Sequence, residues 1–195
     1  VLGRDICSRG IYGRRVSLGV GIAVALISVG IGLILGLVAG YVRVLDAVIM
    51  RTMDGLMSIP AILLAIALIS LSGATLGTVI LAIVIPEVPR VVRLVRAVVL
   101  TVREEPYVEA AIAAGTRLPL ILKRHILPNT IAPLIVQATY VCASAMLTES
   151  ILGFLGAGIP PEIPSWGNIM SEGRTYFQIS PWIIFFPGIG LALTV

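Results

Sequence analysis

Four long stretches of this sequence contain no Asp, Glu, Lys or Arg, and they determine what the chain can fold into. They cover residues 16–42, 55–86, 126–148 and 175–195. About 20 apolar residues in a helix cross the roughly 30 Å hydrocarbon core of a bilayer, and soluble domains rarely contain such runs. With 58% hydrophobic and 12% charged residues, the composition also excludes an ordinary soluble domain. The sequence therefore predicts an all-α, polytopic transmembrane helical bundle.

The uncharged stretches predict about five membrane spans in this chain. The stretch 55–86 is too long for one span, because it would reach about 48 Å as a helix. It contains Ser, Gly and Thr at residues 70–75, which favour a turn there. The expected spans lie at residues 16–42, roughly 57–71, from about 75 onward, about 131–157 and 179–195.

The distribution of Lys and Arg predicts the orientation in the membrane. The connections 43–54 and 87–125 contain nine of these residues, whereas 1–15, 70–75 and 149–174 together contain five. Because Lys and Arg accumulate in cytoplasmic connections, we expect 87–125 on the cytoplasmic side. The exception is an N-terminal cluster that this orientation places outside: Arg4, Arg9, Arg14 and Arg15.

Small residues recur at four-residue spacing on one face of the first expected span. They are Ser28, Gly32, Gly36 and Gly40. Small side chains on one helix face allow the backbone of a neighbouring helix to approach closely. We interpret this face as a helix-packing seam, either within the chain or between subunits.

Two acidic residues inside apolar stretches are candidate functional sites, because ionisable groups are costly in lipid. Glu87 precedes Arg90 by three positions, so the two can pair on one helical face beside a proline kink. Glu149 either pairs with an arginine of another segment or faces a translocation path. Two more pairs at three-residue spacing are expected at the membrane boundary: Arg43 with Asp46, and Arg51 with Asp54.

The one long polar connection, residues 103–128, predicts two short helices joined by a turn. Residues 107–111 favour a helix that is ended by Gly115, and residues 117–127 favour a second helix that is ended by Pro128. Two such helices projecting from the cytoplasmic face would form a compact surface that another protein could bind.

The sequence lacks the motifs of P-loop ATPases and of HExxH zinc enzymes. Lys123 follows Leu122, so no Gly-x-x-x-x-Gly-Lys-Ser/Thr phosphate-binding loop is present. A single histidine, His125, excludes a HExxH motif and a cluster of imidazole ligands. We therefore expect no catalytic residue, no metal site and no cofactor in this chain. Cys7 and Cys142 suggest no disulfide framework, and no basic stripe interleaved with aromatic residues indicates nucleic-acid binding.

Several motifs together resemble the permease subunits of binding-protein-dependent ABC importers. Glu109-Ala110-Ala111, Gly115 and His125-Ile126-Leu127-Pro128 are similar to the EAA loop of that family, and His-Ile-Leu-Pro-Asn is similar to its dipeptide, oligopeptide and nickel subgroup. The resemblance covers essentially the whole chain. The other matching blocks are Gly3-Arg4-Asp5, Arg15-Val16-Ser17-Leu18, Phe154-Leu155-Gly156-Ala157-Gly158, Pro164-Ser165-Trp166-Gly167-Asn168 and Gly173-Arg174.

The resemblance implies a permease of six helices in the cell inner membrane. Residues 1–195 would then be a single transmembrane domain that lacks the first helix and part of the last, with residues 103–128 as its cytoplasmic coupling loop. A coupling helix in that loop would dock into a groove of a separate ATPase subunit, which would bind ATP and Mg. The coupling residues implied are Glu109, Ala110, Ala111, Gly115, His125 and Pro128.

The resemblance also implies the remaining partners and the function. The partners are a second permease subunit that is similar but not identical, an extracytoplasmic solute-binding protein and membrane lipid. The function is ATP-driven import of peptides, or of a related small solute such as a nickel complex, by alternating access. An alternative is an ion-coupled secondary transporter or channel, in which Glu87 or Glu149 would bind the coupling ion. A third hypothesis, an intramembrane enzyme, has no nucleophile and base pair that can be named.

Overall fold

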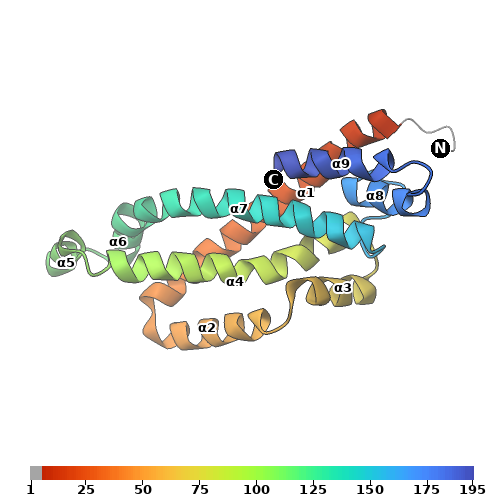
Figure 1. Ribbon diagram of the computed structural model, residues 1–195. Helices are drawn as coiled ribbons and strands as arrows, with labels where there is room; N and C mark the ends of the chain where they lie inside the picture. Colours follow the sequence, from red (N-terminus) through yellow and green to blue (C-terminus); the bar gives the residue numbers. More distant parts are fainter. Residues whose placement is uncertain (1–5) are drawn as a thin grey trace. The chain divides into compact units, whose positions relative to one another are not determined.

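The computed structural model describes residues 6–195, with side chains from Ser8 onward. The motif Gly3-Arg4-Asp5 and the side chain of Cys7 lie outside the described residues. This part of the chain is helical without a strand, as the sequence predicts (Figure 1). The helices are α1 (Ile6–Tyr41), α2 (Arg43–Met57), α3 (Ala61–Ser72), α4 (Leu76–Val102), α5 (Pro106–Ala113), α6 (Leu118–Ile121), the π-helical turn η1 (Leu122–Ile126), α7 (Leu127–Phe154), α8 (Trp166–Thr175) and α9 (Trp182–Thr194).

In the part of the chain that the structure describes, two continuous helical segments are long and apolar enough to cross a membrane, Ser8–Tyr41 and Leu118–Phe154. The pair α2 and α3 makes a third if the two helices count as one bent span. The turn expected in the long uncharged stretch is confirmed, because α3 ends at Ser72 and Gly73 follows with a φ of 83°. A residue with a side chain rarely adopts that backbone conformation, which explains a glycine at this turn.

The helix predicted to end at Pro128 continues through it, so this prediction is wrong. α6, η1 and α7 form one helical segment from Leu118 to Phe154. A proline lacks an N–H and its ring collides with the carbonyl four residues earlier in a regular α-helix. The π-helical turn just before it relieves this conflict, since the Leu127 N–H bonds to the Leu122 oxygen five residues back.

The chain forms two compact units. One contains the described residues up to Ala25 together with Pro60–Val84 and Tyr140–Val195, and the other contains Leu26–Ile59 and Ile85–Thr139. α1, α4 and α7 each contribute residues to both units.

In the unit that contains Leu26–Ile59, the small residues of α1 pack against valines of α4. A Cβ added to Gly32, Gly36 or Gly40 would lie 2.5, 2.6 or 2.6 Å from the Cβ atom of the facing valine. Ser28, the first member of the series, is fully buried. The facing residues are Val91, Val95 and Val99, which repeat at the same four-residue spacing. The two helix backbones therefore meet at a distance that no larger residue permits.

In the other unit, α8 and α9 form a core with the neighbouring part of α7. Its buried members are Met146, Trp166, Ile169, Ile183 and Leu191. The segment after α7 turns at Gly156, which has a φ of 80°. A Cβ on Gly158 would lie 2.5 Å from the Gly153 Cα, and a Cβ on Gly167 would lie 2.8 Å from the Ser150 carbonyl oxygen. Glycine at these positions lets the irregular segment fold back closely on α7 and α8.

Two contacts attach α8 to the beginning of α1 in the same unit. The Arg9 guanidinium pairs with the Glu172 carboxylate at 2.6 Å, and the Trp166 Nε1–H donates to the Gly10 carbonyl oxygen at 3.0 Å. The side-chain oxygen of Ser165 caps the N-terminus of α8 by accepting from the Asn168 N–H.

Candidate functional site

The helix predicted to contact another protein, α5, presents most of its surface to the outside. Figure 1 shows α5 beyond the end of α4. Pro106 occupies its first turn, where the missing N–H costs no hydrogen bond, and Glu109 lies in the same turn, where the helix dipole favours an acid. Glu109 and Ala110 are exposed and Ala111 is half-buried, whereas Val108 is the one buried residue of this helix.

Gly115 makes the turn that follows α5, as the sequence predicts. Its φ is 74°, and a Cβ added to it would meet nothing within 4 Å. The Thr116 N–H reaches back to the Ala111 carbonyl oxygen at 3.0 Å, which closes the end of the helix around the glycine. The residue is therefore needed for its backbone conformation and not to make space for a neighbour.

Apolar side chains that precede and follow this turn in the sequence are exposed, and no sequence pattern singled them out. Ile112 is 49% exposed and Leu120 is 49% exposed, while Leu118 is also open to the surroundings. Exposed acids precede them at Glu104 and Glu105, and exposed bases follow them. A mixed surface of this kind, with apolar residues between charges of both signs, is typical of a protein-binding site.

His125 and Pro128, the other two predicted coupling residues, differ in their surroundings. Pro128 is exposed, whereas His125 is half-buried in η1. The ring of His125 lies beside the ring of Tyr107, with 5.9 Å between the ring centroids and a tilt of 44°. The Asn129 side-chain Nδ2 donates to the His125 carbonyl oxygen at 2.6 Å and to the Tyr107 hydroxyl at 3.3 Å.

The expected pair between Glu87 and Arg90 is confirmed. Glu87 is 3% exposed, and the Arg90 Nη1 donates to both of its carboxylate oxygens, at 2.9 and 3.2 Å. The two residues lie in α4 beside the helix-internal prolines Pro86 and Pro89. The arginine of the same helix compensates the negative charge of this carboxylate, so no bound ion is needed for that.

Glu149 is fully buried, and within residues 6–195 its hydrogen-bond partner is a hydroxyl and not an arginine. The Ser17 Oγ–H donates to Glu149 Oε2 at 2.9 Å, while Oε1 has no hydrogen-bond partner among the described residues. Ser17 in turn accepts weakly from the Trp166 N–H at 3.4 Å. This contact joins α7 to α1 and to the first residue of α8, and the sequence contains no local signal for it.

The pairs predicted inside α2 are wrong. Asp46 binds Arg96 through two hydrogen bonds of 2.5 and 2.6 Å, and Asp54 binds Arg93 at 2.5 Å. Both arginines belong to α4, while the predicted partners in α2, Arg43 and Arg51, are exposed. The Arg96 guanidinium on the facing helix binds both oxygens of Asp46 through two N–H groups, the strong geometry for an arginine–carboxylate pair.

The Asp46 carboxylate lies outside the expected membrane spans and has a lowered pKa. The hydrogen bond from Arg96 is the main cause, and the positive charges of Arg96 and Arg103 act in the same direction against partial burial. Because the folded chain holds this carboxyl ionised more strongly than the unfolded chain does, the pair stabilises the fold above the ordinary Asp pKa of about 3.9. That stabilisation is lost as the pH falls through the native pKa.

We predict that the stability difference between the wild-type chain and Asp46→Asn shrinks on acidification. At pH 7 the variant should unfold at a lower temperature. The difference should shrink once the pH falls below about 3.9, the pKa of Asp in an unfolded chain, because unfolding then takes up a proton at residue 46 that the folded wild type does not hold. Thermal unfolding of the detergent-solubilised protein measures this. Arg96→Gln should remove the same pH dependence of stability, because it removes the arginine that pairs with Asp46. A difference between wild type and Asp46→Asn that stays constant from pH 7 to pH 3 would contradict the assignment.

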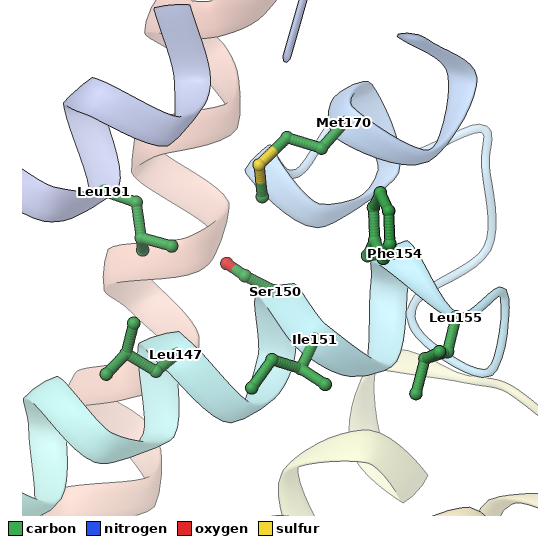
Figure 2. Close-up of a pocket in the computed structure, with 7 residues that line it drawn as sticks. All are labelled: Leu147, Ser150, Ile151, Phe154, Leu155, Met170 and Leu191. Carbon is green, nitrogen blue, oxygen red and sulfur yellow. The ribbon is translucent and has the colours of Figure 1, made fainter. Parts of the chain in front are cut away.

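A cavity of about 190 Å³ lies among α7, α8 and α9. Figure 2 shows the Ser150 hydroxyl beside a lining that is otherwise apolar, and this hydroxyl has no hydrogen-bond partner among the described residues. The remaining lining residues are Leu147, Ile151, Phe154, Leu155, Met170 and Leu191. The cavity lacks a charged group that could hold the ammonium or carboxylate end of a peptide. Among residues 6–195 there is also no group of three or more His, Cys, Asp or Glu arranged for a metal ion.

The chain matches a family model and several curated proteins. Residues 28–195 match the family described as binding-protein-dependent transport system inner membrane component. The probable peptide ABC transporter permease protein y4tQ of Sinorhizobium fredii is 58% identical over 194 residues, which are 100% of this chain and 67% of that protein. The dipeptide transport system permease protein DppC of Alkalihalophilus pseudofirmus is 43% identical over 194 residues, which are 99% of this chain and 64% of that protein. The chain thus spans about two thirds of the length of these relatives.

A solved structure has the same fold. It is described as inward-facing conformations of the MetNI methionine ABC transporter, and it is similar to this chain with a TM-score of 0.68. The match covers 93% of this chain and 88% of the other, at 20% sequence identity. The helix order described above is therefore that of a known membrane-protein architecture.

Proposed function

Because the chain belongs to the family of inner membrane components of binding-protein-dependent transport systems, we propose that it is the permease subunit of an ATP-driven importer for peptides or related small solutes. Its place is the inner membrane, which it crosses several times. The substrate class is supported by the names of the relatives, since y4tQ is described as a probable peptide permease and DppC as a dipeptide permease.

The observation that carries this proposal is the exposed helix α5 with its glycine turn. α5 has one buried residue, Val108, and its surface combines Glu109 with the exposed apolar side chain of Ile112. A helix that buries so little of itself in its own chain is suited to bury its surface in a groove of another protein. We assign that groove to a separate ATPase subunit, which binds ATP and Mg. Glu109, Ala110, Ala111 and Gly115 form the contact.

The proposed mechanism is alternating access driven from the cytoplasm. Residues 103–128 lie on the cytoplasmic side, as the distribution of Lys and Arg favours. Closure of two ATPase subunits on ATP moves α5, and the membrane helices reorient so that the path opens toward a loaded solute-binding protein outside. A second permease subunit, similar but not identical, completes the path. This chain performs no covalent step, in keeping with the description of its relatives as permeases.

The decisive experiment is transport by the complete protein reconstituted in liposomes with its partner permease, ATPase and solute-binding protein. Uptake of a labelled dipeptide should require ATP and stop when the ATPase subunits are omitted. A labelled nickel complex in a parallel sample distinguishes the two solute classes. Uptake that is driven by an ion gradient without any ATPase would refute the proposal and support the ion-coupled transporter, which the names of the relatives do not favour.

A further inference from the structure

We propose that Tyr107, His125 and Asn129 form a brace that fixes the coupling helix α5 to the start of the membrane helix α7. Through this brace, movement of α5 is passed to α7 and is not absorbed by the turn between them. The proposal rests on the proposed function of α5, and it assigns His125 an internal role in place of direct contact with the ATPase. These three are positioning residues, because they act through α5 and α7.

The geometry of the brace joins three elements through one amide group. The Asn129 Nδ2 carries two hydrogens and lies within hydrogen-bonding distance of two acceptors, the His125 carbonyl oxygen at 2.6 Å and the Tyr107 hydroxyl at 3.3 Å. The Tyr107 ring lies beside the His125 ring at a centroid distance of 5.9 Å. Tyr107 belongs to α5, whereas His125 and Asn129 lie in η1 and α7 of one continuous helical segment, so the two contacts of Tyr107 are the ones that join α5 to that segment.

A brace is needed because the covalent connection between α5 and α7 is weakly held. It runs through Gly115, whose backbone conformation is left-handed and where an added Cβ would meet nothing within 4 Å, before the continuous helical segment Leu118–Phe154 begins with α6. Val108 and Ile121 are the buried residues of α5 and α6. Val108 holds α5 by apolar contact, which is not directional and does not determine how the helix is rotated. The hydrogen bond and the ring contact of Tyr107 are directional, so they determine how α5 is rotated relative to α7.

The π-helical turn explains why these residues meet. Pro128 cannot donate a backbone hydrogen bond, and η1 widens the helix just before it, with the Leu127 N–H bonding five residues back. Asn129 follows the proline directly, and its side chain supplies a donor to the His125 carbonyl at the end of the widened turn. Single π-helical turns within α-helices occur often at functional sites. Here the turn lies between the partner-binding helix and the membrane span.

The test uses the complete ATP-driven transporter and measures uptake per ATP hydrolysed. Tyr107→Phe removes the hydroxyl and keeps the ring, and Asn129→Ala removes the shared amide. Each should lower uptake per ATP by about three- to tenfold, the range expected for loss of a hydrogen bond. The double variant should be no worse than the single variants, because both remove the same contact. Co-purification of the ATPase should stay at the wild-type level, since Glu109 and Gly115 are untouched.

Conservative and control variants separate the brace from a general structural effect. His125→Phe keeps a ring beside Tyr107 and should retain more coupling than His125→Ala. Tyr140→Phe removes the hydroxyl of an exposed tyrosine elsewhere in α7 and should change nothing. Unchanged uptake per ATP in both Tyr107→Phe and Asn129→Ala would overturn the proposal. Loss of ATPase co-purification in these variants would also overturn it, because the residues would then be contact residues.

A structural measurement tests the brace independently of transport. Spin labels on cysteines placed at Ala113 in α5 and Val136 in α7, both exposed, report the distance between the helices after the native cysteines are replaced. The distance distribution should broaden in Tyr107→Phe and not in Tyr140→Phe, and an equally narrow distribution in all variants would refute the brace. Failure of the proposed function is distinguishable, because it appears as uptake without ATPase in the wild-type protein.

Discussion

Replacing Gly115 with proline is expected to abolish both solute uptake and co-purification of the ATPase, while the chain still inserts into the membrane. Gly115 has a φ of 74°, whereas proline is restricted to about −65°. The turn after α5 therefore cannot form, and the surface around Glu109 loses its shape. Uptake in cells, ATPase pull-down and membrane fractionation measure the three outcomes.

A conservative substitution at the same residue provides the control. Asparagine tolerates the left-handed conformation better than other residues with a side chain, and a Cβ at residue 115 meets nothing within 4 Å. Gly115→Asn should therefore retain most uptake. Glu109→Lys tests the surface itself without altering the backbone and should also abolish co-purification. Wild-type amounts of ATPase bound to both Gly115→Pro and Glu109→Lys would refute the coupling role of this helix.

The substitution Gly36→Leu is expected to cause a large loss of stability. A Cβ at residue 36 would lie 2.6 Å from the Val95 Cβ, and the nearby backbone oxygen of Val92 is 3.0 Å away. α1 and α4 would have to separate, because neither the valine Cβ nor the backbone can move aside on its own. We expect a cost of about 3 kcal/mol, which corresponds to a decrease of about 6–12 °C in the unfolding temperature for a chain of this size.

Gly30→Leu is the matched control for this effect, since Gly30 lies on the same helix and a Cβ there would meet nothing within 4 Å. Its unfolding temperature in detergent should stay within about 2 °C of the wild type, the range of surface substitutions. Equal loss of stability in Gly30→Leu and Gly36→Leu would show that leucine disturbs α1 itself and that the close contact with α4 is not the cause.

Features that depend on local chemistry could be predicted from the sequence. The apolar runs predict helices because a backbone in lipid must satisfy its own hydrogen bonds, and α1 and α7 agree with this. The turns at Gly73 and Gly115 follow from the conformational freedom of glycine. The Glu87 to Arg90 pair follows from helical spacing alone, and the structure confirms it. Each of these inferences needs only residues that are close in sequence.

Features that depend on which helices meet could not be predicted. Asp46 pairs with Arg96, which lies 50 residues away, although Arg43 has the spacing of a helical neighbour. Glu149 receives its hydrogen bond from Ser17 on α1, at a separation of 132 residues. Pro128 was expected to end a helix, but the π-helical turn before it allows the helix to continue.

The amino-acid sequence by itself determined that this chain is a helical membrane protein and where its main turns lie, and it predicts which loop binds a partner. The periodicity of apolar residues, the spacing of charges and the positions of glycines involve residues within one or two helical turns of one another. They can therefore be recognised in the sequence. The tertiary structure alone decided the partners of Asp46 and Glu149 and the contact of Tyr107 with His125 and Asn129. These contacts depend on how the surfaces of different helices fit together, and that fit exists only after the helices have packed.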